Sequence, residues 1–244
     1  IYAATLFHAD LRIGQLLEAL DRLNLAKDTL VIFSSDNGPA RGAPDAPLTL
    51  GYDSATGLGY GIAAAKGITG GRKGYKAALF EGGVGVPFIA RWPGKIAAGK
   101  VDKTSIFSAV DLLPTFCEIA GVKLPASYRP DGVSQVETLQ GNGKVLREKP
   151  LFWKTIAPWP ARKTKPDHWV SYAVVSKSWK LVANRDAGYV ELYDLVTDPL
   201  EKNDLKEKHP KVVKELTKTL EQWQTTLPPE PTGNVFSNLR NPKK

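Results

Sequence analysis

The sequence predicts an α/β protein in two parts, and three patterns indicate it. Leucine and isoleucine recur at helical spacing across residues 1–24. A continuous run of β-branched and aromatic residues follows at 29–34, and a helix followed by such a strand is typical of α/β folds. After about residue 145, short apolar runs separated by turn residues indicate a small antiparallel sheet with a helix after it.

The first part is expected to cover residues 1–144. Its opening helix has a predicted apolar face made of Leu6, Ile13, Leu16, Leu17 and Leu20. The run at 29–34 does not alternate with polar residues, so we expect a strand buried on both faces, as in a parallel sheet. Residues 86–92 predict another strand, and 108–120 predict a helix with Cys117 on its core face.

The second part is expected to cover residues 145–244. Its four predicted strands are 151–154, 172–176, 179–183 and 190–195. Pro210 opens a predicted helix through about Leu227, because proline is favoured in the first turn of a helix. The apolar face of that helix is predicted to contain Val213, Leu216, Leu220 and Trp223. The proline-rich tail from Pro228 onward is expected to fray.

Composition narrows the class of protein. Apolar residues make up 42% of the chain, enough for a sizeable core. The net charge of +8 suits anionic partners, but most of these lysines are expected to be ordinary solvated surface residues. The single cysteine, Cys117, excludes a disulfide framework or a cysteine-based zinc site. Because the chain opens with Ile1 and holds no methionine, we expect it to be a fragment whose N-terminal portion is missing.

The first candidate site is Asp36 with Asn37, directly after the predicted strand at 29–34. Ligand sites of open α/β sheets lie at the carboxyl ends of strands. A carboxylate and an amide carbonyl are hard oxygen ligands that suit Ca²⁺ or Mg²⁺. The alternative for these two residues is a simple Asx turn after a strand.

The second candidate is Lys76, in the glycine-rich segment 74–83. Its ammonium group can bind a sulfate or phosphate oxygen as a point charge, and the glycine pair lets the backbone come close. The alternative is a surface lysine before a short helix. Lys73 is a rival candidate, and if residues 75–80 open as a helical turn, the two lysines lie on neighbouring faces. If only Lys76 points at the anion, Lys73 acts through the surface field alone.

Several motifs occur in an order that resembles the type I sulfatase family across most of the chain. They are Ser35-Asp36-Asn37-Gly38; Gly74-Tyr75-Lys76; Glu81-Gly82-Gly83; Val86-Pro87; Trp92-Pro93-Gly94; Asp111-Leu-Leu-Pro-Thr115 with Ala120-Gly121; Asp131-Gly132; Trp179-Lys-Leu181; Glu191-Leu-Tyr-Asp-Leu195; and Asp198-Pro199 with Glu201. Each motif alone is weakly specific. Their common order makes the resemblance strong.

The resemblance implies the C-terminal portion of an alkaline-phosphatase-like α/β enzyme that hydrolyses sulfate esters. It implies that Asp36 and Asn37 are metal ligands, with Ca²⁺ as the usual metal and Mg²⁺ as the alternative, and that Lys76 binds the substrate sulfate. The family nucleophile is a formylglycine made in a Cys/Ser-x-Pro-x-Arg motif, which the surroundings of Cys117 do not match. We therefore expect the nucleophile and the first metal ligands in the missing N-terminal part, and a fragment that is inactive alone. Glu81 and the glycines after it are expected to support the loop.

Two other functions stay open. One is a phosphate or phosphonate ester hydrolase of the same superfamily. The other is a non-catalytic glycan-binding module, which the basic charge and the aromatic segment 159–169 fit. No motif of a nucleic-acid-binding module and no apolar run of about 20 residues is present, so we expect neither nucleic acid nor membrane as partner. The expected substrate is a sulfated polysaccharide or its oligosaccharides, and the expected location is periplasmic or extracellular.

Overall fold

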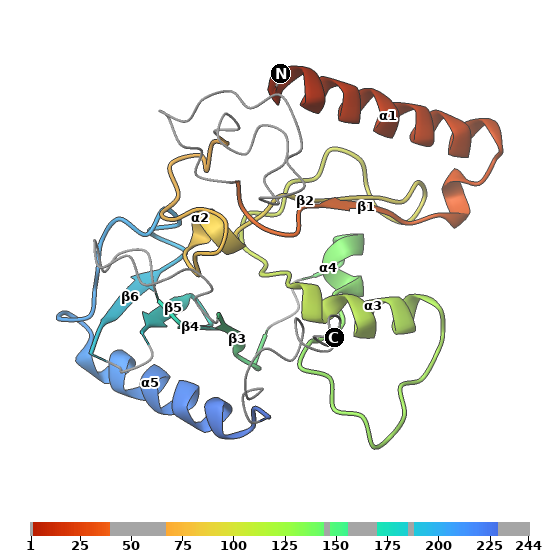
Figure 1. Ribbon diagram of the computed structural model, residues 1–244. Helices are drawn as coiled ribbons and strands as arrows, with labels where there is room; N and C mark the ends of the chain where they lie inside the picture. The colour runs from red at the N-terminus through yellow and green to blue at the C-terminus, as the bar shows by residue number, and fades with distance from the viewer. Residues whose placement is uncertain (1, 40–66, 144–146, 156–169, 185–187, 229–244) are drawn as a thin grey trace, which may run out of the picture.

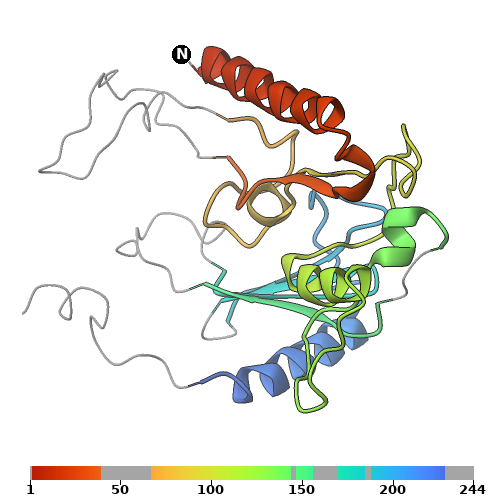
Figure 2. The ribbon, with the colours of Figure 1, turned by 90° about the vertical axis from the view of Figure 1, so that its right-hand side faces the viewer.

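A computed structural model describes residues 2–39, 67–143, 147–155, 170–184 and 188–228 (Figure 1). In chain order, the elements are α1 (Tyr2–Arg22), the 3-10 turn η1 (Ala26–Asp28), β1 (Val31–Ser34), α2 (Glu81–Val84), β2 (Phe88–Arg91), the 3-10 turn η2 (Ala109–Asp111), α3 (Leu112–Ile119), α4 (Val136–Gln140), β3 (Leu151–Lys154), β4 (Tyr172–Ser176), β5 (Trp179–Ala183), β6 (Val190–Asp194) and α5 (Pro210–Thr225). The predicted α/β class is confirmed. In Figures 1 and 2, α1 and α5 lie at opposite edges of the molecule with the strands between them.

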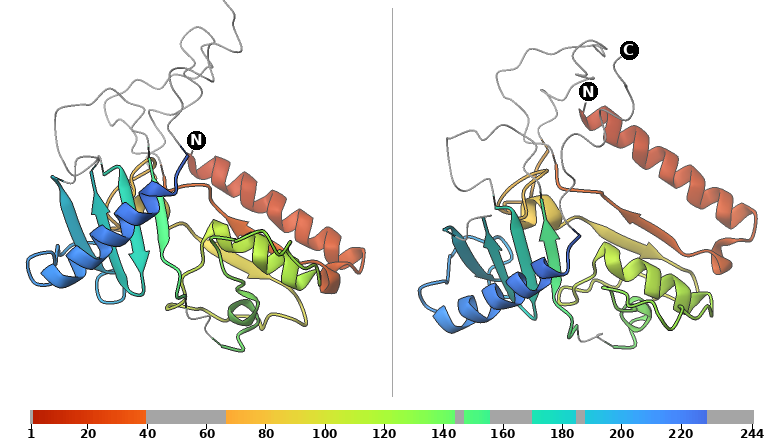
Figure 3. Two further views of the ribbon diagram at one scale, coloured as in Figure 1. Left: turned by 90° about the horizontal axis from the view of Figure 1, so that it is seen from below. Right: turned by 60° about the horizontal axis from the view of Figure 1, so that its bottom comes forward.

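The four C-terminal strands form one antiparallel sheet, as predicted, and their order is β3-β4-β5-β6. One face of this sheet packs against α5 (Figure 3), and Val174, Leu181 and Leu192 on that face are fully buried. Leu216 and Leu220 of α5 complete the core, with Val213 and Trp223 packed beside it. The predicted apolar face of α5 is therefore confirmed. Alternate residues of each strand, and residues spaced by 3.6 along the helix, point into the same core.

The opposite face of the same sheet packs against the glycine-rich segment. Leu79 and Phe80 meet Ala173, Val182 and Tyr193 in a second buried cluster. The sheet is thus a layer between α5 on one side and the segment that carries Lys76 on the other (Figure 3). The predicted boundary after residue 144 lies outside the described residues and stays a prediction.

The strand after α1 differs from its prediction. β1 pairs with β2 in an antiparallel ribbon, with Val31 opposite Arg91, and no other described strand pairs with either one. Phe33 and Ile89 are 46% and 60% exposed, so the prediction of a strand buried in a parallel sheet is wrong for the described residues. A continuous apolar run indicates that a strand can be covered on both faces, but strand direction depends on partner residues in β2 that lie 54 to 60 positions away.

The helix α1 forms where it is predicted but buries little of its apolar face. Leu6, Phe7 and Leu16 are each more than half exposed. Polar contacts join this end of the chain to β2: Asp21 pairs with Arg91 at 3.0 Å, and the Trp92 indole nitrogen donates to the Lys27 carbonyl. Among the described residues, the helices lack the length or apolarity that a bilayer span requires.

The predicted helix at 108–120 is present as η2 followed by α3. Asp111 is fully buried, accepts from the backbone N–H groups of Ser108 and Val133, and pairs with Arg147. This carboxylate therefore ties the start of α3 to two later parts of the chain. Cys117 is only half-buried, so its predicted place in the core is wrong.

Candidate metal and anion site

The first candidate pair lies in the turn that follows β1. The Asn37 side-chain amide donates to an Asp36 carboxylate oxygen at 3.2 Å, and the Ser35 hydroxyl donates to the Asn37 carbonyl at 2.9 Å. Asp36 is exposed and Asn37 is half-buried. The two side chains therefore lie together at the surface, where a rotation of the Asn37 amide would present its oxygen beside the carboxylate.

Glycines let this turn touch the glycine-rich segment. The Gly38 N–H donates to the Gly83 carbonyl at 2.8 Å, and a Cβ atom on Gly38 would overlap the Gly82 carbonyl. A Cβ atom on Gly82 would in turn overlap the carbonyls of Lys73 and Gly74. Only residues without a side chain allow this approach of backbone to backbone.

We expect Gly82→Ala to destabilise the protein by about 3 kcal/mol, because the overlap involves backbone atoms that cannot move aside cheaply. Urea unfolding followed by circular dichroism measures the change. The matched control is Gly143→Ala, since a Cβ atom there meets nothing within 4 Å. Equal stability of the two variants would contradict this packing.

Lys76 is presented by a tight turn. Its N–H donates to the Pro39 carbonyl at 2.9 Å, and it lies between Gly74 and Ala77, whose φ angles are +82° and +73°. The left-handed Ala77 excludes a helical turn at 75–80, and helical structure in this segment begins only at Glu81. A non-glycine residue in this region costs about 1 kcal/mol, and such strain is found where a loop must present a side chain.

Lys76 and Asn37 line the same hollow, which has a volume of about 640 Å³. Arg72, Glu81 and Leu6 also line it, whereas Asp36 lies beside it without lining it. The structure thus brings Lys76 to the turn that carries both predicted metal ligands. Arg72 is a second cation that the sequence reasoning missed. Its signal is a third basic residue in the segment Arg72-Lys73-Gly74-Tyr75-Lys76.

Lys73 turns away from this hollow. Its ammonium group contacts the Glu191 carboxylate at 2.7 Å and the Tyr193 hydroxyl at 2.9 Å, and lies 4.3 Å from the centre of the Phe80 ring. The expectation that Lys73 acts only through the surface field is wrong, because β6 supplies a carboxylate for it. Burial, together with the Glu191 carboxylate, raises the pKa of the Tyr193 phenol, which keeps that hydroxyl neutral.

Glu81 lies at the start of α2 and supports the segment, as predicted. Its carboxylate accepts from Lys180 at 2.8 Å, and its N–H donates to Glu201 at 2.6 Å. Lys180 and Glu201 were missed as partners. The available signal is a lysine in the middle of an otherwise apolar strand, which needs a buried counter-charge.

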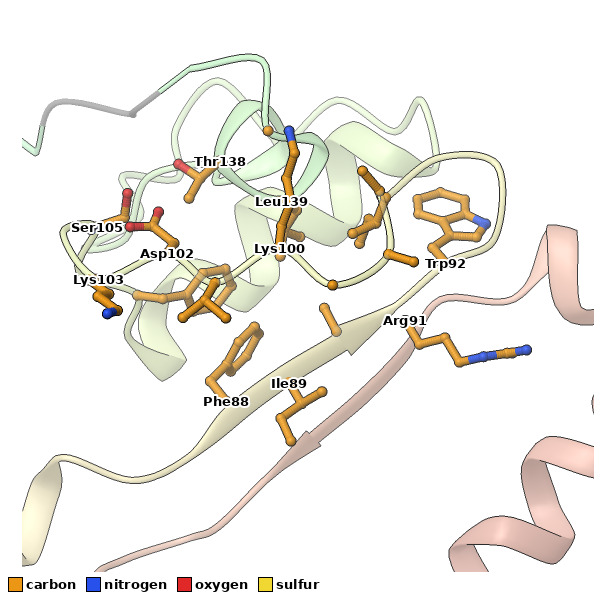
Figure 4. Close-up of a pocket in the computed structure, with 18 of the residues that line it drawn as sticks. Phe88, Ile89, Arg91, Trp92, Lys100, Asp102, Lys103, Ser105, Thr138 and Leu139 are labelled. Carbon is orange, nitrogen blue, oxygen red and sulfur yellow. Dashed lines mark hydrogen bonds between the residues drawn. The ribbon is translucent and has the colours of Figure 1, made fainter. Parts of the chain in front are cut away.

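A second, larger hollow lies elsewhere, between β2, the loop after it and α4 (Figure 4). Its lining includes Phe88, Trp92 and Asp102, and none of the predicted site residues. Hydrogen bonds from Ser105 and Thr104 lower the pKa of the Asp102 carboxyl. That carboxylate is therefore engaged in its own turn.

The donor set limits what the described residues can hold. No cluster of three or more histidine, cysteine, aspartate or glutamate side chains occurs among them. Asp36 and Asn37 can supply two oxygen donors, whereas Ca²⁺ takes 6–8 and Mg²⁺ about six. The pair therefore fits part of a hard-cation site and needs further ligands.

Comparison with known families identifies the class. The family model "Sulfatase" matches residues 1–122, and "N-sulphoglucosamine sulphohydrolase, C-terminal" matches residues 72–226. The chain belongs to the sulfatase family, and the resemblance stated from its motifs is confirmed.

Individual relatives agree with this family. An N-acetylgalactosamine-6-O-sulfatase of Bacteroides thetaiotaomicron is 30% identical over 230 residues, which is 88% of this chain and 40% of the relative. Bovine arylsulfatase A (Bos taurus) is 34% identical over 152 residues, which is 62% of this chain and 26% of the relative. The chain therefore spans less than half the length of these relatives.

Solved structures confirm the alkaline-phosphatase-like fold. A Bacteroides thetaiotaomicron sulfatase described in work on glycosaminoglycan metabolism has a TM-score of 0.64 and 28% identity. The match covers 89% of this chain and 43% of that sulfatase chain. A second structure, solved in complex with a neocarrahexaose, has a TM-score of 0.71 at 23% identity. The match covers 99% of this chain and 46% of the chain in that structure. The second likeness concerns the fold alone.

Proposed function

We propose that this chain forms the substrate-anion half of a sulfatase that hydrolyses sulfate esters of carbohydrates. The observation that carries the proposal is the backbone connection between two parts of the site. Gly38 donates to Gly83, and Lys76 donates to Pro39, so the turn with Asp36 and Asn37 and the turn with Lys76 border one hollow.

The roles follow from the chemistry of these side chains. The Lys76 ammonium binds a sulfuryl oxygen and stabilises the negative charge that develops there during the reaction. Arg72 adds a second positive charge at the same hollow. Asp36 and Asn37 would hold a divalent cation, Ca²⁺ or else Mg²⁺, together with ligands from outside this sequence. When bound, that cation supplies Lewis-acid polarisation of the sulfate oxygens.

The nucleophile is proposed to lie outside this sequence, as a formylglycine. No residue here matches the Cys/Ser-x-Pro-x-Arg motif, and the chain spans 40% of the length of the N-acetylgalactosamine-6-O-sulfatase that it matches. That relative acts, by its name, on a sulfated amino sugar. A net charge of +8 suits a polyanionic glycan of this kind, and a periplasmic or extracellular location would place the enzyme beside such a substrate.

The full-length protein is expected to hydrolyse an aryl sulfate at least about a hundredfold faster, in kcat/KM, than the matching aryl phosphate. The purified 244-residue chain is expected to show no turnover above a Lys76→Ala control, because it lacks the motif in which the formylglycine nucleophile is made. Release of the phenol, followed by absorbance, measures both. A preference for phosphate would favour the phosphate-ester hydrolase instead, and turnover by the chain alone would show that the nucleophile is within it.

A further inference from the structure

The segment that carries Lys76 and the C-terminal sheet exchange charges in both directions. Lys73 of the segment reaches Glu191 of β6, while Lys180 of β5 reaches Glu81 of the segment at 2.8 Å. A third carboxylate, Glu201, contacts the same Lys180 ammonium at 2.9 Å. We call these five side chains the interlayer charge cluster. It joins residues that are 118 and 99 positions apart in the sequence.

We propose that Lys180 is a positioning residue, whose buried ammonium fixes Glu81 and thereby the turn that presents Lys76 to the substrate anion. This inference rests on the proposed function of Lys76. Lys180 itself is fully buried and does not line the hollow, so it acts through Glu81, which does.

The geometry around Lys180 leaves Glu81 little freedom. Its carboxylate is held by Lys180 and its N–H by the Glu201 carboxylate, which contacts the same ammonium. The following residue, Gly82, donates its N–H to the Lys73 carbonyl at 2.7 Å. The side chain of Glu81 and the backbone at the start of α2 are therefore both fixed. The turn at 74–80 is thus anchored at its C-terminal end.

The conformation of Glu201 supports the same inference. Its φ angle is +55°, a left-handed value that a glutamate rarely adopts, yet its side chain is fully buried and contacts Lys180. Burial raises the pKa of Glu201, and the Lys180 charge opposes that rise. A strained backbone and a buried charge are retained together where the surrounding structure fixes a functional geometry.

Lys180 also neutralises a charge that would oppose the substrate. The Glu81 carboxylate lies in the lining of the hollow, where it would repel a sulfate group. The ion pair with Lys180 leaves Lys76 and Arg72 as the cations that face an incoming anion. A change at Lys180 can therefore act through position or through charge, and the experiment has to separate the two.

The test uses Lys180→Met in the full-length enzyme, assayed on an aryl sulfate. We expect kcat to fall by about tenfold to a hundredfold, because a misplaced charge-stabilising group loses transition-state binding. In a Lys76→Ala background the same change should cost less than about twofold, since the group that Lys180 positions is already absent. Adding Glu81→Gln to Lys180→Met should restore KM at most, and full recovery of kcat would mean that charge alone is responsible.

Leu192→Ala is the matched control for stability. Leu192 is as buried as Lys180 and lies in the same sheet, but its side chain faces α5. The substitution should therefore weaken the sheet without removing a contact of the interlayer charge cluster. Its kcat should stay within about twofold of wild type at temperatures where both variants are folded. An equal loss of kcat in Leu192→Ala would overturn the positioning role.

Hydrogen exchange supplies a readout that does not need activity. Backbone amides in residues 74–84 should exchange at least about tenfold faster in Lys180→Met, and at the wild-type rate in Leu192→Ala. Unchanged exchange in Lys180→Met would overturn the inference. Faster exchange in a protein whose wild type hydrolyses no sulfate ester would uphold the anchoring of the turn and contradict the proposed function instead.

Discussion

Asp36→Ala in the full-length enzyme is expected to remove nearly all sulfatase activity, by about three orders of magnitude or more, while the protein still folds. Loss of a carboxylate should weaken a hard-cation site strongly, and with it the Lewis-acid stabilisation of the transition state. The fold should survive because Asp36 is exposed, and its carboxylate accepts a hydrogen bond from the side chain of its neighbour Asn37. Metal content by mass spectrometry, kcat/KM and the thermal midpoint measure the three quantities.

Ser35→Ala is the matched control for the turn. The Ser35 hydroxyl bonds the Asn37 carbonyl, so its loss disturbs the same turn without removing a metal ligand. We expect it to bind metal as the wild type does and to keep activity within about tenfold. Wild-type metal content and rate in Asp36→Ala would show that Asp36 is only a turn residue.

Lys76→Ala is expected to lower kcat/KM by about two orders of magnitude or more, the scale for losing a charge-stabilising donor in a water-poor site. Folding should be unaffected, because the Lys76 contact that the structure records is made by its backbone N–H. The loss should persist when salt is raised from 50 mM to 500 mM, since a direct contact is screened far less than a distant charge.

Two other lysines serve as controls for this variant. Lys123→Ala removes an exposed charge, and its small effect should shrink with added salt. Lys73→Ala breaks a part-buried ion pair with Glu191, so we expect a lower thermal midpoint more than a direct loss of catalysis. If Lys73→Ala lowered kcat/KM more than Lys76→Ala in folded protein, Lys73 would be the sulfate ligand.

Features that depend on local periodicity could be predicted from the sequence. The four C-terminal strands and the buried face of α5 follow from period-2 and period-3.6 patterns, and the structure confirms them. The antiparallel direction of β1 could not be predicted, because it depends on pairing with residues of β2 that lie 54 to 60 positions away. An apolar run carries no information about the direction of its partner.

The candidate site was predictable in part for the same reason. Asp36, Asn37 and Lys76 belong to short motifs, and the last two line one hollow. The ion pair of Lys73 and the role of Lys180 depend on carboxylates 118 and 99 positions away, which no local pattern identifies. A helical turn at 75–80 does not form, because Ala77 adopts a left-handed conformation that its residue type does not favour, and no local pattern indicates this.

The interlayer charge cluster has a consequence for synthesis of the chain. Lys73 leaves the ribosome 118 residues before Glu191, which at 5–20 residues per second is a delay of roughly 6–24 s. Throughout that interval Lys73 cannot pair with the carboxylate of β6, and the turn that presents Lys76 cannot pack against the complete C-terminal sheet. The turn should therefore reach its final conformation only after β5 and β6 have been synthesised. The anion-binding geometry is then completed after the C-terminal sheet, although Lys76 itself is synthesised earlier.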